Sequence, residues 1–313
     1  MKIFSLLFTV SVLFLSHSPA SAMLSTLRQE EKIETVRNVQ KKINEKVNET
    51  ALKTYQKINS NWTYVKPNEE MSVDSPYWEA KWIMGESYEG KKQKTRIPTL
   101  VLKTSPDKIE EALEDLINKP ASLECTIALN TAKLFCIKEI LNEFGKNTFT
   151  GFSTIFYNLL DETEGWSIEQ FFHELPEQFL TRVEGKEIPG SICYITNIPD
   201  YGYYKPNGNG RGSNVFCMKN NQYLGFSSIY KKGPQSLETI VNQDRDLFLD
   251  TQDVERGQES HSILSKQLKE TKGLFEELRQ KEQKKNCNFH IIFDAKKFIG
   301  FQHSRKVLLM DGS

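Results

Sequence analysis

Cys125 is the side chain in this sequence best placed to act as a nucleophile. It follows Glu124 directly and stands in the first turn of a long apolar segment that we expect to be a helix. Backbone N–H groups and the helix dipole stabilise an anion there, so we expect a lowered pKa for the Cys125 thiol. A thiolate attacks acyl groups, and the same N–H groups could hold the resulting oxyanion. Glu124 could orient a base or act as one. The alternative is that Cys125 is a small core residue.

A buried helix must present Cys125. Residues 122–144 carry apolar side chains on nearly every side at helical spacing and stop before a glycine, which is suited to a C-cap. The small residues of this helix allow a sheet to approach closely. Short strands are expected at 191–195, 214–218 and 222–229, with the last two joined as a hairpin. Together these elements predict an α+β fold in which the helix packs on an antiparallel sheet.

The same periodicities assign the remaining segments. We expect a helix over 27–60, short strands anchored by tryptophans over 61–100, a helix over 105–118, mixed helix and loop over 151–185, charged helices over 235–283, and a final strand pair at 289–293 and 306–309. The apolar stripe of the first helix is thin, so that helix either docks on the main domain or contacts a helix of a partner.

The first residues are typical of a secretory signal peptide. Lys2 supplies a positive charge, Ile3 to Leu15 is almost wholly apolar, and Ala20 to Ala22 is a small-x-small cleavage signal. The apolar run is shorter than the roughly 20 residues that span a bilayer, which favours cleavage over a membrane anchor. We therefore expect export to a secreted or periplasmic location, with no integral membrane span after cleavage.

Composition restricts the class of partner. The chain has 313 residues, of which 26% are charged, and its 41 basic and 41 acidic side chains balance. A protein that neutralises many phosphates needs a basic excess, so we expect no nucleic-acid partner. The length and composition fit a folded protein of one or two domains.

The five cysteines show no metal-binding motif. There is no CxxC pair and no Cys/His cluster at zinc spacing, so we expect no metal and no cofactor. A disulfide scaffold is also not expected, because a chain of this length can bury an adequate core without one.

Several motifs in residues 75–240 resemble those of one bacterial family, the spore-coat protein-glutamine γ-glutamyltransferases, or transglutaminases. Leu123–Ala128 is similar to that family's nucleophile helix start, and Tyr77-Trp78 to an upstream aromatic pair. Pro189–Asp200 is similar to its Pro-Gly-Asp-x-x-Tyr-Phe-x-Asn-Pro strand. Gly212–Val215 and Gln222–Phe226 resemble its Gly-Glu-Asn-Val and Glu-Tyr-Phe-Gly-His blocks, in the same order.

The resemblance implies a papain-like core of the NlpC/P60 type and a two-step reaction. The Cys125 thiolate would attack a glutamine carboxamide and release ammonia. A lysine amine would then resolve the thioester and cross-link two proteins. The implied partners are protein substrates that carry glutamine and lysine.

Two positions depart from the family. Its catalytic acid falls at Ser213 and its catalytic histidine at Phe226. Loss of general acid–base help slows a reaction by typically about 10²–10⁴. The resemblance leaves Glu124 as the substitute acid, and Asn214 could orient it or donate to the oxyanion. His173 could also supply a base.

Three functions therefore stay open. The first is an exported transglutaminase-like acyltransferase with Cys125, Glu124 and Asn214 as site residues. The second is the same fold with the reaction lost, acting as a binding or envelope-interaction protein. The third is a thiol amidase or hydrolase. The expected organisation is a signal peptide over 1–22, a helical segment over 23–70, the core over 71–240 and a charged helix and strand extension over 241–313.

Overall fold

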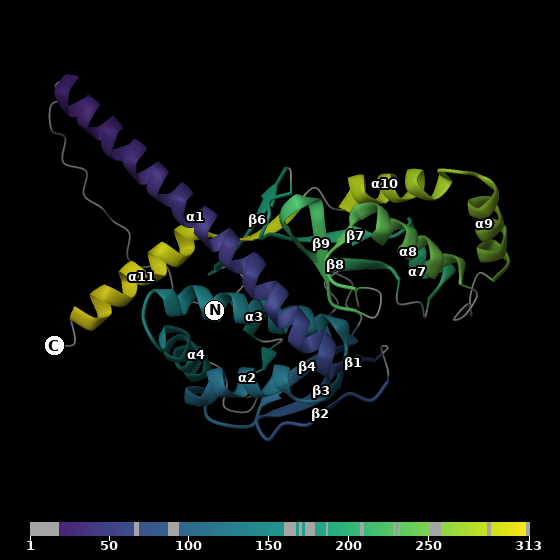
Figure 1. The fold of residues 1–313 in the computed structure, drawn as a ribbon, viewed down its shortest axis with the longest axis horizontal. Coiled ribbons are helices and arrows are strands. Elements are labelled where there is room, and N and C mark those ends of the chain that lie inside the picture. The colour runs from purple at the N-terminus through teal and green to yellow at the C-terminus, as the bar shows by residue number, and fades with distance from the viewer. Residues whose placement is uncertain are drawn as a thin grey trace. The chain divides into compact units, whose positions relative to one another are not determined.

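The computed structural model describes most of the chain (Figure 1). The described residues are 19–65, 69–86, 94–159, 167–168, 171–172, 179–185, 187–206, 210–227, 230, 232–250, 258–286 and 289–310. Residues Gln40–Ser313 form one compact unit and Met1–Val39 another. The predicted signal peptide lies mostly outside the described residues, and it stays a prediction, as do the domain boundaries. Among the described residues, no helix has both the length and the apolar character needed to cross a bilayer.

The fold is α+β, as expected. The helices are α1 (Pro19–Asn61), α2 (Ile109–Asn118), α3 (Cys125–Glu143), α4 (Thr148–Leu159), α7 (Tyr201–Tyr204), α8 (Leu237–Leu249), α9 (Gln258–Glu270), α10 (Leu274–Asn286) and α11 (Ala295–Met310). The strands are β1 (Trp62–Tyr64), β2 (Ser72–Val73), β3 (Trp78–Glu86), β4 (Lys94–Leu102), β5 (Ala121–Leu123), β6 (Leu180–Glu184), β7 (Ile192–Thr196), β8 (Gly212–Cys217), β9 (Gln222–Gly225), β10 (Gln235–Ser236) and β11 (Phe289–Phe293).

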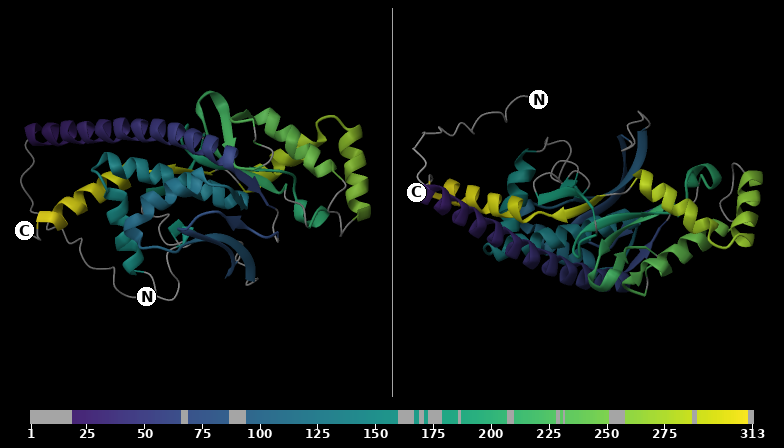
Figure 2. Two further views of the ribbon diagram at one scale, coloured as in Figure 1. Left: turned by 60° about the horizontal axis from the view of Figure 1, so that its bottom comes forward. Right: turned by 90° about the horizontal axis from the view of Figure 1, so that it is seen from above.

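The largest sheet is antiparallel and has the strand order β10-β9-β8-β7-β11-β6. The expected hairpin forms its centre, because β8 and β9 are joined by a short turn at Lys219–Asn221. Helix α3 contacts β8, and α10 contacts β7. Figure 2 shows α8, α9 and α10 gathered at one end of the compact unit and α11 at the opposite end.

Helix α3 is buried along most of its length, which confirms the sequence analysis. Its buried residues include Ile127, Leu134, Cys136, Ile137 and Leu141. The Cys136 thiol lies 3.8 Å from the Val47 carbonyl oxygen of α1, so α1 packs directly on α3. The inner half of α1 is therefore docked within the compact unit, whereas Ile33 is 55% exposed.

The tryptophans anchor the region after α1, as expected. The indole N–H of Trp62 donates to the Leu116 carbonyl oxygen at 3.2 Å, and that of Trp78 donates to the Ala112 oxygen at 2.7 Å. Both acceptors lie on α2. The strands β3 and β4 pair over nine residues each and are longer than the short strands we expected.

Two segments take a different type of structure from the one that the sequence analysis predicts. The long helix begins at Cys125 rather than Ser122, because Ala121–Leu123 pairs with β1 and β2 as a strand. Residues 306–309 were expected to form a strand but belong to α11. A short apolar run fits either a strand or a helix. Here the Asp294 carboxylate accepts a hydrogen bond from the Lys296 N–H at the start of α11, and that helix continues through residues 306–309.

Candidate active site

A strand-to-helix junction positions Cys125. Strand β5 lies between β1 and β2, and its last residue, Leu123, pairs with Tyr64 of β1. Glu124 follows with extended backbone angles and is the N-cap of α3. Cys125 is then the first helical residue, and its side chain is partly exposed.

Glu124 and Cys125 form a hydrogen-bonded pair. The thiol donates to Glu124 Oε1 over an Sγ–Oε1 distance of 3.0 Å. The other carboxylate oxygen accepts from the backbone N–H of Thr126 at 2.6 Å. The Glu124 carboxylate therefore caps the helix with one oxygen and accepts a hydrogen bond from the thiol with the other. The cap fixes the position of the carboxylate.

The thiol is not acidic in this setting. Burial, the negative charge of Glu124 and the hydrogen bond to Glu124 raise the pKa of the Cys125 thiol well above its usual value. The prediction of a lowered pKa is wrong, because burial of the thiol, together with the anion that the cap places beside the sulfur, outweighs the helix dipole. Cys125 therefore needs a proton acceptor at the moment of attack.

Two tyrosines, Tyr64 and Tyr230, lie near enough to Cys125 to interact with it electrostatically. Burial raises the pKa of Tyr64, and the nearby Cys125 raises it further. Burial also raises the pKa of Tyr230, where Ser213 opposes the shift and Cys125 adds to it. The hydroxyl oxygen of Tyr64 is buried and has no hydrogen-bond partner. Tyr55 donates to the Tyr230 carbonyl oxygen and accepts from the Gly233 N–H at 2.9 Å.

Phe226 is a packing residue. It is 3% exposed, and its ring lies edge-on to those of Tyr55 and Phe216, with centroid distances of 5.9 and 6.2 Å. Position 226 therefore has no titratable group, where the resembling family has a histidine, and its ring makes aromatic contacts instead. Ser213 lies close enough to Tyr230 to affect its pKa.

Asn214 is not joined to the pair. It lies in β8 opposite Tyr194, with an exposed side chain. Within the described part of the chain, no hydrogen bond links Asn214 to Cys125 or Glu124. Its role in the reaction stays a prediction.

No described histidine is hydrogen-bonded to Cys125 or Glu124. His261 Nε2 lies 2.9 Å from the Phe248 carbonyl oxygen, and His290 lies in β11. His173 lies outside the described residues. Among the described residues, Glu124 is the side chain that accepts a hydrogen bond from the thiol.

A second group of reactive side chains was missed by the sequence analysis. Cys193, Cys217 and His290 lie together, although they are far apart in the sequence. No linear motif could have found them. Correct strand pairing across β11, β7 and β8 would have been the necessary signal.

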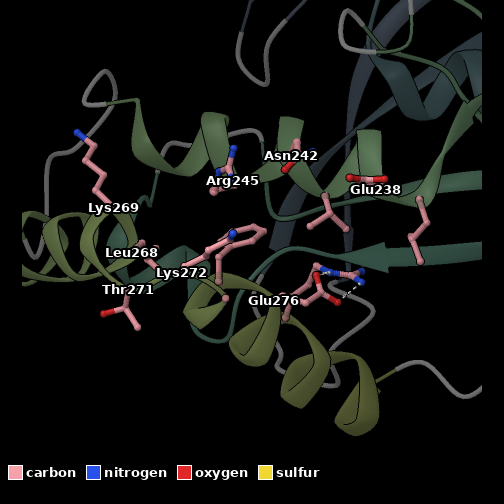
Figure 3. A pocket seen from close by; sticks show the side chains of 13 residues that line it. Glu238, Asn242, Arg245, Leu268, Lys269, Thr271, Lys272 and Glu276 are labelled. Atoms are coloured by element: carbon pink, nitrogen blue, oxygen red, sulfur yellow. Dashed lines mark hydrogen bonds and ion pairs between the residues drawn. The ribbon is translucent and has the colours of Figure 1, made fainter.

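A cavity of about 720 Å³ lies among α8, α9 and α10 (Figure 3). Leu268 and Phe275 line its apolar part, and Arg245 and Lys272 add positive charge. Glu276 accepts a hydrogen bond from Arg279 at 3.1 Å. Cys125 does not line this cavity, which is thus separate from the candidate active site.

Comparison with known proteins finds a structural likeness but no sequence relative. No family model matches the chain, and no curated protein matches it. Among solved structures, it is similar to a transglutaminase from Geobacillus stearothermophilus without its C-terminal extension. The TM-score is 0.42 and the identity 13%, over 66% of this chain and 84% of that one.

Proposed function

We propose that this chain is a thiol acyltransferase in which Cys125 is the nucleophile and Glu124 accepts its proton. The observation that carries the proposal is the 3.0 Å hydrogen bond from the Cys125 thiol to Glu124 Oε1. A candidate base must lie within hydrogen-bond reach of the proton it removes, and Glu124 meets that condition.

The reaction would proceed in two balanced steps. In the first, the thiol proton passes to Glu124 as the sulfur attacks the carboxamide carbon of a glutamine side chain. The C–N bond then breaks, and the proton leaves with ammonia. In the second, a lysine amine attacks the thioester, the C–S bond breaks, and the amine proton returns to the sulfur.

The high thiol pKa suits a concerted version of the first step. Because the Cys125 pKa is raised, little thiolate exists at neutral pH before substrate binds. Proton transfer to Glu124 during attack removes the need for a preformed anion. The buried hydroxyl of Tyr64 has no hydrogen-bond partner and is a candidate donor to the oxyanion.

Amine incorporation tests the proposal. The protein is incubated with a glutamine-rich acceptor protein and a fluorescent primary amine, beside the variants Cys125→Ala and Glu124→Gln. We expect labelling that Cys125→Ala abolishes and Glu124→Gln strongly reduces, with circular dichroism unchanged. Labelling that persists in Cys125→Ala would refute Cys125 as the nucleophile. Release of ammonia without capture of the amine would instead identify an amidase.

Two observations favour a second candidate, the same fold with its reaction lost. Phe226 fills the place of the family's histidine with a packed ring, and the thiol pKa is raised rather than lowered. Such a protein would act by binding, for example at the cell envelope. Absence of labelling together with a Cys125 that resists iodoacetamide near neutral pH would support it.

The remaining proposals concern location and partners. We propose export through the N-terminal segment, and proteins that carry glutamine and lysine as substrates. Residues 27–60 are a candidate contact for a partner helix, because Ile33 is exposed in this segment. N-terminal sequencing of the secreted protein would test export and cleavage after Ala22.

A further inference from the structure

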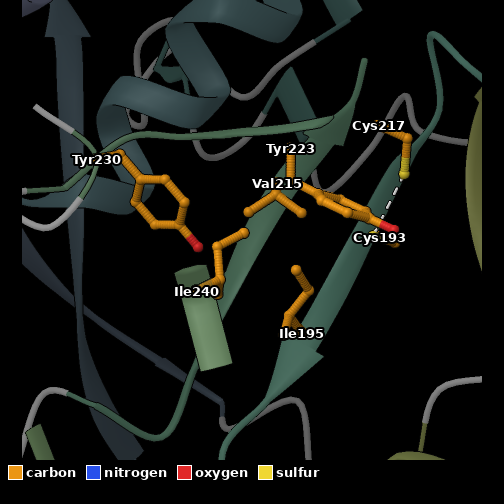
Figure 4. Packing of buried hydrophobic residues seen from close by; sticks show 7 residues of the cluster. All are labelled: Cys193, Ile195, Val215, Cys217, Tyr223, Tyr230 and Ile240. Carbon is orange, nitrogen blue, oxygen red and sulfur yellow. Dashed lines mark hydrogen bonds between the residues drawn. The ribbon is translucent and has the colours of Figure 1, made fainter. Parts of the chain in front are cut away.

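Strand pairing places Cys193, Cys217 and His290 on one face of the large sheet. Ile291 pairs with Ile192, so the antiparallel register sets His290 beside Cys193. Cys193 pairs with Val215, two residues before Cys217. Side chains two residues apart on a strand share a face. Figure 4 shows the two cysteines meeting across β7 and β8.

The three side chains are close together and buried. The two sulfur atoms are 3.3 Å apart. Both sulfurs and a ring nitrogen of His290 lie within 4.8 Å of one another. Exposure is 7% for Cys193, 3% for Cys217 and 5% for His290. The described cysteines form no disulfide.

The hydrogen bond of His290 defines which nitrogen is available. Nε2 lies 2.9 Å from the Gly185 carbonyl oxygen. A carbonyl oxygen only accepts, so Nε2 carries the proton and Nδ1 keeps its lone pair. Nδ1 is buried and has no hydrogen-bond partner. Metal-binding histidines typically donate their other ring N–H to such a carbonyl, which fixes the tautomer.

We propose that Cys193, Cys217 and His290 Nδ1 bind one thiophilic closed-shell cation, Zn²⁺ or Cu⁺. Two thiolates and an imidazole are the donors that these cations prefer. Zn–S bonds of about 2.3 Å in a tetrahedron separate two sulfurs by about 3.8 Å, so the present 3.3 Å spacing needs little change. Binding converts both thiols to thiolates and releases two protons to solvent.

The neighbouring groups determine how many protein donors the cation would have. Tyr223 lies in the same buried cluster as both cysteines, and its hydroxyl donates to Glu187. Because that hydroxyl is already bonded, the described residues offer three protein donors to a cation at this site. They suit trigonal Cu⁺, or tetrahedral Zn²⁺ with one further ligand such as water. The proposal does not depend on the chemistry proposed for Cys125.

Metal titration tests the site. The reduced, metal-free protein is titrated with Zn²⁺, with Cu⁺ held by a competing chelator, and with Co²⁺ as a spectroscopic probe. We expect one cation per chain and a thiolate-to-cobalt charge-transfer band. Cys193→Ser and Cys217→Ser should abolish that band. His290→Gln should weaken binding by more than the roughly 10–100-fold that loss of an outer partner costs. The comparison of Zn²⁺ with Cu⁺ shows which cation is preferred.

Matched variants and a measurement on the wild-type protein distinguish the loss of a metal ligand from misfolding. Cys136→Ser and His261→Gln also change buried residues but should leave binding unchanged. X-ray absorption on the metal-loaded wild-type protein should report two sulfur ligands and one histidine nitrogen. The proposal is overturned if the wild-type protein binds no cation, or if the double cysteine variant binds as tightly as wild type. A Cys193–Cys217 disulfide in the protein as isolated, detected as a loss of two hydrogens by mass spectrometry, would also overturn it.

Discussion

The carboxylate of Glu124 accepts a hydrogen bond from the Cys125 thiol, with Sγ and Oε1 3.0 Å apart, and through its other oxygen it caps the helix that Cys125 begins. The two roles oppose each other electrostatically. The cap stabilises the helix start, whereas the same negative charge disfavours the thiolate. We therefore expect Glu124 to control both the acidity and the reactivity of Cys125.

Replacing Glu124 with Gln should make Cys125 more acidic and less active. Removal of the charge lowers the thiol pKa, so iodoacetamide alkylation near neutral pH should speed up by about tenfold for each pKa unit lost. Acyl transfer should fall by about 10²–10⁴, because the proton acceptor is gone. Glu79→Gln, an exposed change on β3, is the control and should alter neither rate. Alkylation that slows in Glu124→Gln would contradict the assigned interaction.

Tyr64→Phe should leave stability intact while reducing acyl transfer. The Tyr64 hydroxyl is buried without a hydrogen-bond partner, so its removal costs little or stabilises the fold. If the hydroxyl donates to the oxyanion, kcat should fall by about 10²–10³ with KM nearly unchanged. Thermal unfolding and steady-state amine incorporation measure the two effects. Tyr203→Phe, at a 62% exposed side chain, serves as the comparison. An unchanged kcat would exclude Tyr64 from the reaction.

Phe226→Ala should destabilise the fold by about 3–5 kcal/mol, because it removes a buried ring that packs on Tyr55 and Phe216. Urea unfolding of this variant and of Ile263→Ala, which truncates a 54% exposed side chain, gives the difference. A cost below about 1 kcal/mol would show that position 226 does not have the packing role assigned to it.

Asp244 should make stability fall as pH rises. It is 1% exposed, and burial raises the pKa of its carboxyl from 3.8 to about 7, with Arg279 opposing the shift. As pH rises, the Asp244 carboxyl therefore loses its proton at a lower pH in the unfolded chain than in the folded protein. The stabilising contribution is complete below about pH 4 and is lost as pH rises to about 7, with a magnitude on the order of 4 kcal/mol.

Asp244→Asn tests this pH dependence by urea unfolding from about pH 4 to about pH 8. The variant should become more stable than wild type as pH rises, since its neutral side chain needs no proton. Asp246→Asn changes an exposed carboxylate on the same helix and should track wild type. Parallel curves for wild type and Asp244→Asn would show that Asp244 ionises normally.

Local sequence determined much of the fold. The all-round apolar pattern of α3 requires burial, because each of its faces would otherwise expose hydrocarbon to water. The hairpin of β8 and β9 follows from two apolar runs separated by a short polar turn. The contact between Glu124 and Cys125 is also local, since adjacent residues at a helix start are held together by the cap itself.

Only the tertiary structure decided what lies far apart in the chain. Ala121–Leu123 became a strand because β1 and β2 supplied hydrogen-bond partners on both sides. The thiol pKa rose because burial and the capping charge act together in three dimensions. Cys193, Cys217 and His290 met because three strands aligned in one register, and no spacing along the sequence carries that register.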